Sequence, residues 1–176
     1  EPLERGQVYA RLRAASRDWP GGHAPQAFLA LFAHDVSGTT VTLAGGKGIN
    51  VARALKRLDV PVVATGLAGG RTGTRIVEEL TEEAILNDFV RIRDESRTST
   101  LVVDPTSGTQ TEINEWGPKV TESELGTLMD KLRYLSRGAD AVVFAGSLPR
   151  GVGERFYADA ARELGRRGIK AALDTE

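Results

Sequence analysis

Three glycines and a lysine lie together at residues 45–48, in the order Gly-Gly-Lys-Gly, and Asn50 follows them. Glycine lets a ligand approach the backbone closely because it has no Cβ atom. Lys47 adds a mobile positive charge, and Asn50 offers both a donor and an acceptor. Backbone N–H groups at the start of a helix attract anions and hydroxyl-rich molecules. The stretch could therefore hold a polar, oxygen-rich small molecule. The alternative is an ordinary flexible turn before a helix.

The same stretch does not match a Walker A phosphate loop. Such a loop places serine or threonine directly after its lysine, whereas Gly48 follows Lys47 here. The glycines at 66–73 also miss the G-x-G-x-x-G spacing of dinucleotide-binding loops. Neither stretch favours a bound nucleotide.

The elements that must position these residues can be predicted from the apolar pattern. A helix follows the glycine-rich stretch to about Leu58, and β-branched residues at 39–43 predict a strand leading into it. Beyond it, short apolar segments alternate with amphipathic ones. The predicted strands span 60–66, 88–92, 139–145 and 170–174, and the predicted helices span 74–80, 121–135 and 154–167. This alternation predicts a parallel sheet covered by helices.

A hairpin interrupts the alternation. Residues 98–103 and 108–114 alternate polar with apolar side chains, and the turn sequence Asp-Pro-Thr-Ser-Gly joins them. A partial alternation at 7–13 predicts a further edge strand. In open parallel sheets, ligands sit beyond the carboxyl ends of the strands, where residues 66–70 and 146–149 fall.

Composition excludes several classes of function. The 176 residues carry a net charge of −1, which gives no argument for binding nucleic acid or a membrane surface. No apolar run is long enough to span a bilayer. The absence of cysteine excludes disulfides and fits a reducing cytoplasm, and the two histidines have no second-ligand pattern around them, so no metal site is expected.

Five short stretches occur in an order typical of one family, at residues 45–52, 66–73, 96–98, 111–115 and 144–151. The series resembles the ribokinase-like (phosphofructokinase-B) sugar kinases, and within them most closely the 1-phosphofructokinase and tagatose-6-phosphate kinase branch. The resemblance covers residues 44–176. It implies an α/β, ribokinase-like parallel sheet flanked by helices, with a small β-sheet lid. The chain would be a single incomplete domain over 1–176, with lid strands near 7–13, 39–43 and 98–114.

The resemblance also implies an activity, the phosphorylation of a sugar phosphate with ATP and Mg²⁺. The implied substrate-binding residues are Gly45, Gly46, Lys47, Asn50, Arg97 and Ser147. The glycines and Asn50 would contact sugar hydroxyls, and Lys47 would sit near the phosphate or hydroxyls. Arg97 would pair with the phosphate already on the substrate, and Ser147 would reach the sugar from the end of its strand. The hairpin would belong to a lid that also forms a homodimer.

Two departures from the family limit this interpretation. The opening Asn-Pro-Ala-x-Asp segment is not found before residue 44, and the catalytic Gly-Ala-Gly-Asp occurs nowhere in the 176 residues. We therefore expect a truncated, substrate-binding part that does not transfer phosphate alone, without catalytic or metal-binding residues of its own. The ATP and Mg²⁺ sites would lie largely outside this chain. The alternatives are a non-catalytic remnant or sugar-binding module, and a kinase of an unphosphorylated sugar or nucleoside.

Overall fold

The computed structural model describes residues 41–175, and residues 42–176 form a compact unit. The predicted strand at 7–13 lies outside the described residues. The elements in chain order are α3 (Lys47–Arg57), β1 (Val63–Gly69), α4 (Gly70–Glu82), β2 (Leu86–Ile92), β3 (Ser99–Asp104), β4 (Thr109–Asn114), α5 (Glu122–Leu135), the 3₁₀ helix η1 (Ser136–Gly138), β5 (Ala141–Ala145), α6 (Phe156–Arg166) and β6 (Lys170–Asp174).

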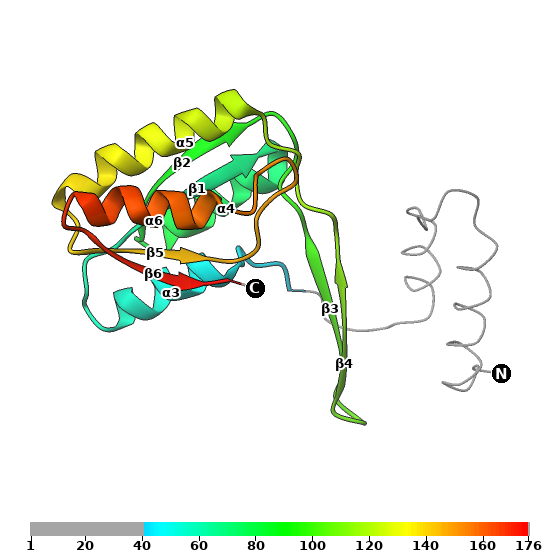
Figure 1. The fold of residues 1–176 in the computed structure, drawn as a ribbon. Helices are drawn as coiled ribbons and strands as arrows, with labels where there is room; N and C mark the ends of the chain where they lie inside the picture. The colour runs from blue at the N-terminus through cyan, green and yellow to red at the C-terminus, as the bar shows by residue number, and fades with distance from the viewer. Residues whose placement is uncertain (1–40, 176) are drawn as a thin grey trace. The chain divides into compact units, whose positions relative to one another are not determined.

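Two pairs of parallel strands and one antiparallel hairpin make up the sheets of this described part (Figure 1). β1 pairs with β2 so that Val63 lies opposite Leu86, and β5 pairs with β6 so that Ala145 lies opposite Asp174. The helices α4 and α6 supply the crossovers that parallel pairs require. The predicted α/β fold is thus confirmed, with its parallel sheet present as two separate pieces.

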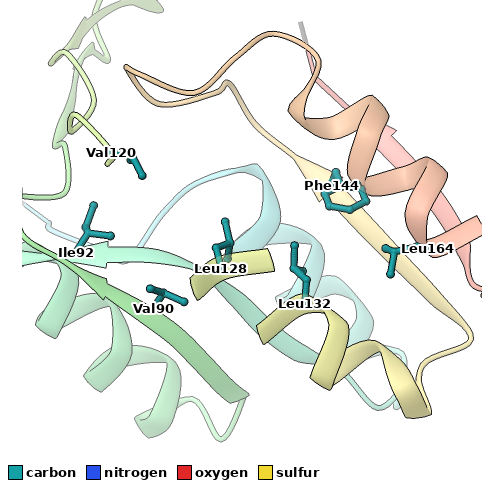
Figure 2. Close-up of a cluster of buried hydrophobic side chains, with 8 residues drawn as sticks. Val90, Ile92, Val120, Leu128, Leu132, Phe144 and Leu164 are labelled. Carbon is teal, nitrogen blue, oxygen red and sulfur yellow. The ribbon is translucent and has the colours of Figure 1, made fainter. Parts of the chain in front are cut away.

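One apolar core joins the two parallel pieces. Its buried members are Val90, Ile92, Val120, Leu128, Leu132, Phe144, Ala160 and Leu164. Figure 2 shows Leu128 and Leu132 of α5 between the β2 side chains on one side and Phe144 and Leu164 on the other. The burial of this apolar surface holds both strand pairs in one unit.

A second core lies beneath the glycine-rich turn. Its buried members are Ala44, Ile49, Ala52, Ala64, Leu80 and Ile85. They come from the start of α3, from β1, from the end of α4 and from the segments just before α3 and β2. Leu80 of α4 is 0% exposed and belongs to the same buried cluster as Ile49 and Ala52 of α3. The start of α3 therefore packs on a tightly filled core. This core fixes the place of the turn in the fold.

The helix predicted at 121–135 and the hairpin are both confirmed. Thr121 and Glu124 form a reciprocal capping box, in which the Glu124 carboxylate accepts from the Thr121 N–H at 2.8 Å and the Thr121 hydroxyl oxygen accepts from the Glu124 N–H at 3.3 Å. In the hairpin, β3 and β4 pair antiparallel with Ser99 opposite Asn114. Figure 1 shows this hairpin extending away from the helices.

The sequence predicted a strand ending at 66 and a helix beginning at 74, with residues 67–73 as the loop between them, and this loop is wrong. The strand β1 continues to Gly69 and α4 begins at Gly70. Gly69 and Gly73 are needed here because neighbouring atoms leave no room for a side chain. A Cβ atom on Gly69 would lie 1.7 Å from the Asp94 carbonyl oxygen, and one on Gly73 would lie 2.6 Å from the Ala68 carbonyl carbon.

The strand predicted at 39–43 is also wrong over its described part, residues 41–43, which belong to no strand. Val41 and Leu43 are each 71% exposed. Side chains of α4 hold this segment, since Arg75 Nη2 donates to the Thr42 carbonyl at 3.1 Å. β-branched residues favour a strand only where a neighbouring strand accepts them, and none pairs with these residues among those described.

Candidate functional site

The glycine-rich turn is exposed and its helix start has no side-chain cap. Gly46 is the N-cap of α3, with φ 119° and ψ 150°, a region that is essentially reserved for glycine. The Asn50 N–H donates to the Gly46 carbonyl at 3.0 Å, which closes the first helical turn. The earlier N–H groups of α3 therefore face no side-chain acceptor within the described residues. They are available to an anionic or hydroxyl-bearing ligand.

Lys47 is brought to the carboxyl ends of the second strand pair. Its Nζ lies 3.4 Å from Asp174 Oδ1 at the end of β6, and the two side chains are 44% and 61% exposed. The Asp174 carbonyl accepts from the Gly146 N–H at 2.9 Å, just after the end of β5. An exposed ion pair at this distance contributes little free energy, so a ligand could replace Asp174 as the partner of Lys47. Lys47, Gly146 and Asp174 thus share one edge of the fold.

Ser147, directly after Gly146, and Asn50, near the start of α3, are both exposed. Neither side chain has a hydrogen-bond partner among the described residues. The turn before Ser147 is fixed because the Tyr157 hydroxyl donates to the Gly146 carbonyl at 3.1 Å. Burial raises the pKa of Tyr157, which keeps this hydroxyl a proton donor. Among the described residues, Ser147 therefore offers an unpaired hydroxyl at this edge, and Asn50 offers an unpaired amide near the start of α3.

Arg97 lies at the base of the hairpin and does not contact the glycine-rich turn. Its side chain is exposed and makes no hydrogen bond or ion pair with the residues described here. Its neighbours are held on both sides. The Gly69 N–H donates to Ser96 Oγ at 3.0 Å, and the Thr98 N–H donates to Glu115 Oε2 at 2.8 Å. The structure therefore anchors the backbone around Arg97, while its guanidinium has no partner among residues 41–175.

The start of α4 differs from that of α3 because a carboxylate already occupies it. Glu95 accepts from the Arg71 N–H at 3.2 Å and from the Thr72 N–H at 2.6 Å. The hydrogen bond from Thr72 is the main cause that lowers the pKa of Glu95 below its ordinary value. Glu95 therefore takes two of the N–H groups that an anion at this helix start would use.

Sequence reasoning missed Asp174, which pairs with Lys47, and Glu95, which closes α4. Asp174 carried a usable signal, because it is an acidic residue at the carboxyl end of a predicted strand. Glu95 carried none, since its role depends on a contact with residues more than twenty positions earlier. In residues 41–175, no group of three or more carboxylate, imidazole or thiol side chains is placed to hold a metal ion. The helices described there are also too short or too polar to cross a membrane.

Comparison with known proteins identifies the family. A model of the pfkB family of carbohydrate kinases matches residues 33–172, and a model of a domain family of unknown function matches residues 1–64. The first match spans well over half of the chain. The chain therefore belongs to the pfkB family of carbohydrate kinases.

Solved structures agree with this assignment. A protein from Thermotoga maritima described as a possible 1-phosphofructokinase superposes with a TM-score of 0.71 and 33% identity, over 80% of this chain and 48% of its own. Phosphofructokinase-2 from Escherichia coli, in complex with substrates and products, gives 0.70 and 32% identity, over 75% of this chain and 43% of its own. The ribokinase-like resemblance is thus confirmed. The chain spans less than half the length of these two relatives.

Proposed function

We propose that this chain supplies the substrate-binding part of an ATP-dependent kinase that acts on a sugar phosphate of the fructose 1-phosphate or tagatose 6-phosphate type. One observation carries the proposal: the uncapped start of α3 lies with Lys47 beside the carboxyl ends of β5 and β6. Phosphofructokinase-2 from Escherichia coli has been solved with fructose 6-phosphate, so this sugar phosphate also belongs among the ligands to test.

Each predicted residue has a role in the proposal. Gly45, Gly46 and Asn50 bind sugar hydroxyls through the turn and the first helical N–H groups. Lys47 leaves Asp174 and turns to the ligand phosphate or hydroxyls. Ser147 contacts the sugar from the end of β5. Arg97 pairs with the ligand phosphate through its exposed guanidinium.

ATP and Mg²⁺ are not assigned to particular residues of this chain in the proposal. The pfkB kinases use both groups in general, and we place their sites in the part of the family fold that this chain does not span. No step of phosphate transfer is therefore assigned to these residues.

The hairpin is proposed to act as the lid and as a homodimer surface. Leu101 and Val103 alternate along β3 and are 54% and 57% exposed. Trp116 follows β4 and is 77% exposed. Apolar side chains at this exposure gain free energy when a second copy covers them. Phosphofructokinase-2 from Escherichia coli has a tetrameric inhibited form, so a relative of this chain is known to form an oligomer. A cytoplasmic location completes the proposal, and the cysteine-free composition suits it.

A binding and turnover experiment tests this function. Residues 1–176 alone should bind a sugar phosphate and release no ADP in a coupled assay with fructose 1-phosphate, fructose 6-phosphate and tagatose 6-phosphate. The full-length protein that carries these residues should turn over at least one of the three. Phosphate transfer by the verified 176-residue polypeptide would overturn the division of roles. A full-length protein that binds none of the sugar phosphates would overturn the substrate class.

Substitution of Gly46 should weaken sugar-phosphate binding through the backbone. Alanine at this φ of 119° costs about 1–3 kcal/mol, so we expect Gly46→Ala to raise the Kd by about tenfold. Steric overlap within the free protein is not the cause, because an added Cβ would meet nothing within 4 Å. Gly48→Ala is the control, since its Cβ is equally unobstructed and its φ is not positive. Calorimetric titration would measure both, and equal losses would show that the special conformation of Gly46 is not needed.

A further inference from the structure

Charged side chains bind both backbone polar groups of Ala44, the residue directly before the glycine-rich turn. The Ala44 N–H donates to Glu79 Oε2, and the Ala44 carbonyl accepts from Arg53 Nη1 at 2.6 Å. Ala44 itself is 4% exposed. Hydrogen bonds to charged partners are stronger than those between neutral groups. The peptide groups on both sides of Ala44 are therefore fixed in direction.

The two side chains come from different helices, and each is held by a further charge. Arg53 of α3 donates from Nε to Glu83 Oε2 at 2.7 Å, and its Nη2 donates to the other oxygen of the same carboxylate. Glu79 of α4 accepts from Arg75 Nε at 2.7 Å through its other oxygen. We call Arg53 and Glu79 together the clamp on Ala44. Because each of them has a second partner, neither side chain can rotate freely away from Ala44.

The turn that follows has few restraints of its own. A Cβ atom on Gly46 would meet nothing within 4 Å, and one on Gly45 would meet only the Leu43 carbonyl oxygen, at 3.9 Å. Glycines without packing contacts sample many backbone conformations. The shape of the turn must then be set from its two ends. The Asn50 bond to the Gly46 carbonyl fixes the helical end, and the clamp on Ala44 fixes the other.

We infer that Arg53 and Glu79 are positioning residues, which hold the glycine-rich turn in its ligand-binding shape by fixing Ala44. The inference rests on the proposed function for its ligand, and on the Ala44 contacts for its geometry. Glu79 acts as the carboxylate, and the hydrogen bond from Ala44 is the main cause that lowers its pKa. Neither side chain touches the ligand in this account.

The chain contains a matched control for Arg53. Arg133 of α5 forms the same kind of two-point ion pair across helices, with Glu163 of α6, at 2.6 and 3.0 Å. It lies outside the segment that leads to the turn, and its guanidinium donates to no residue of that segment. Arg53→Lys and Arg133→Lys each remove a guanidinium that binds both oxygens of a carboxylate. Only Arg53→Lys also removes a donor from the Ala44 carbonyl.

Two measurements on the full-length protein test the inference. Hydrogen exchange of the Ala44 and Asn50 amides, which are hydrogen-bonded at the two ends of the turn, should be about tenfold faster in unliganded Arg53→Lys than in unliganded Arg133→Lys. The KM for the sugar phosphate should also rise about tenfold in Arg53→Lys alone, with kcat nearly unchanged. Glu79→Gln provides a second variant, and it should accelerate exchange at the same amides even if Arg53→Lys folds poorly.

Equal exchange rates at the Ala44 and Asn50 amides in the wild type, Arg53→Lys and Glu79→Gln would overturn the inference. So would a rise in KM that is the same in Arg53→Lys and Arg133→Lys, since it would reflect general stability. If the wild-type protein binds neither fructose 1-phosphate, fructose 6-phosphate nor tagatose 6-phosphate, the proposed function fails. The exchange comparison still decides the clamp in that case, because it needs no ligand.

Discussion

Replacing Arg97 with alanine is expected to raise the KM for sugar phosphates by about ten- to a thousandfold. The loss corresponds to about 1.4–4 kcal/mol, which is typical of a charged hydrogen bond removed from a ligand phosphate. The planar guanidinium can bind two phosphate oxygens at once. Arg97 suits this role because its side chain has no partner among the described residues, while Ser96 and Thr98 on either side of it are anchored.

Two comparisons decide whether Arg97 binds the phosphate. Arg97→Lys should recover part of the affinity, because lysine offers a point charge in place of a fork. Arg93→Ala removes an equally exposed arginine before the hairpin, whose side chain has no hydrogen-bond partner in the described part, and it should leave the KM nearly unchanged. Full-length protein should be assayed with a sugar phosphate and with its unphosphorylated sugar. Equal losses for the two substrates would remove the phosphate-binding role and favour a kinase of plain sugars.

Replacing Gly73 with alanine should destabilise the fold by about 1–3 kcal/mol. The added Cβ would lie 2.6 Å from the Ala68 carbonyl carbon and 3.2 Å from the Ala68 Cβ, so α4 would have to move away from β1. Both contacts belong to buried backbone and a small buried side chain, which cannot rotate aside. The expected change is larger than the helix-propensity gain of alanine over glycine, which is at most about 1 kcal/mol.

Gly126 provides the opposite case. It lies within α5, and a Cβ atom there would meet nothing within 4 Å. Gly126→Ala should therefore stabilise the protein by about 0.5–1 kcal/mol through helix propensity. Chemical denaturation of both variants would give the two free energies of unfolding. A Gly73→Ala variant as stable as Gly126→Ala would contradict the tight packing of α4 on β1.

The sequence predicted most of the fold because its apolar periodicity and capping signals are local. The α5 span Glu122–Leu135 and the β6 span Lys170–Asp174 agree closely with prediction. The start of α4 was mispredicted because Gly69 and Gly70 also typify loops. Contacts with residues 92–95 explain why glycine is required at both positions, and Gly70 also has a positive φ of 61°.

The candidate site could be predicted as a set of residue types but not as a network. Lys47 and Asn50 followed from their place at a helix start, whereas the partner of Lys47, Asp174, lies 127 positions away. Arg53 and Glu79 had no local signal, because on their helices they look like ordinary solvent-facing charges. Their contacts with Ala44 depend on how α3 and α4 pack around the buried core beneath the turn.

An NMR titration of the 18.9 kDa chain with fructose 1-phosphate, fructose 6-phosphate and tagatose 6-phosphate tests the central claim most directly. With at least one ligand, saturable amide shifts should concentrate at residues 45–50, at 146–147 and at Asp174, and a further shift should occur at Arg97. The α5–α6 face around Arg133 and Glu163 should stay unchanged. A well-dispersed spectrum in which all three ligands leave residues 45–50 unperturbed would contradict the claim that the glycine-rich turn binds the sugar phosphate.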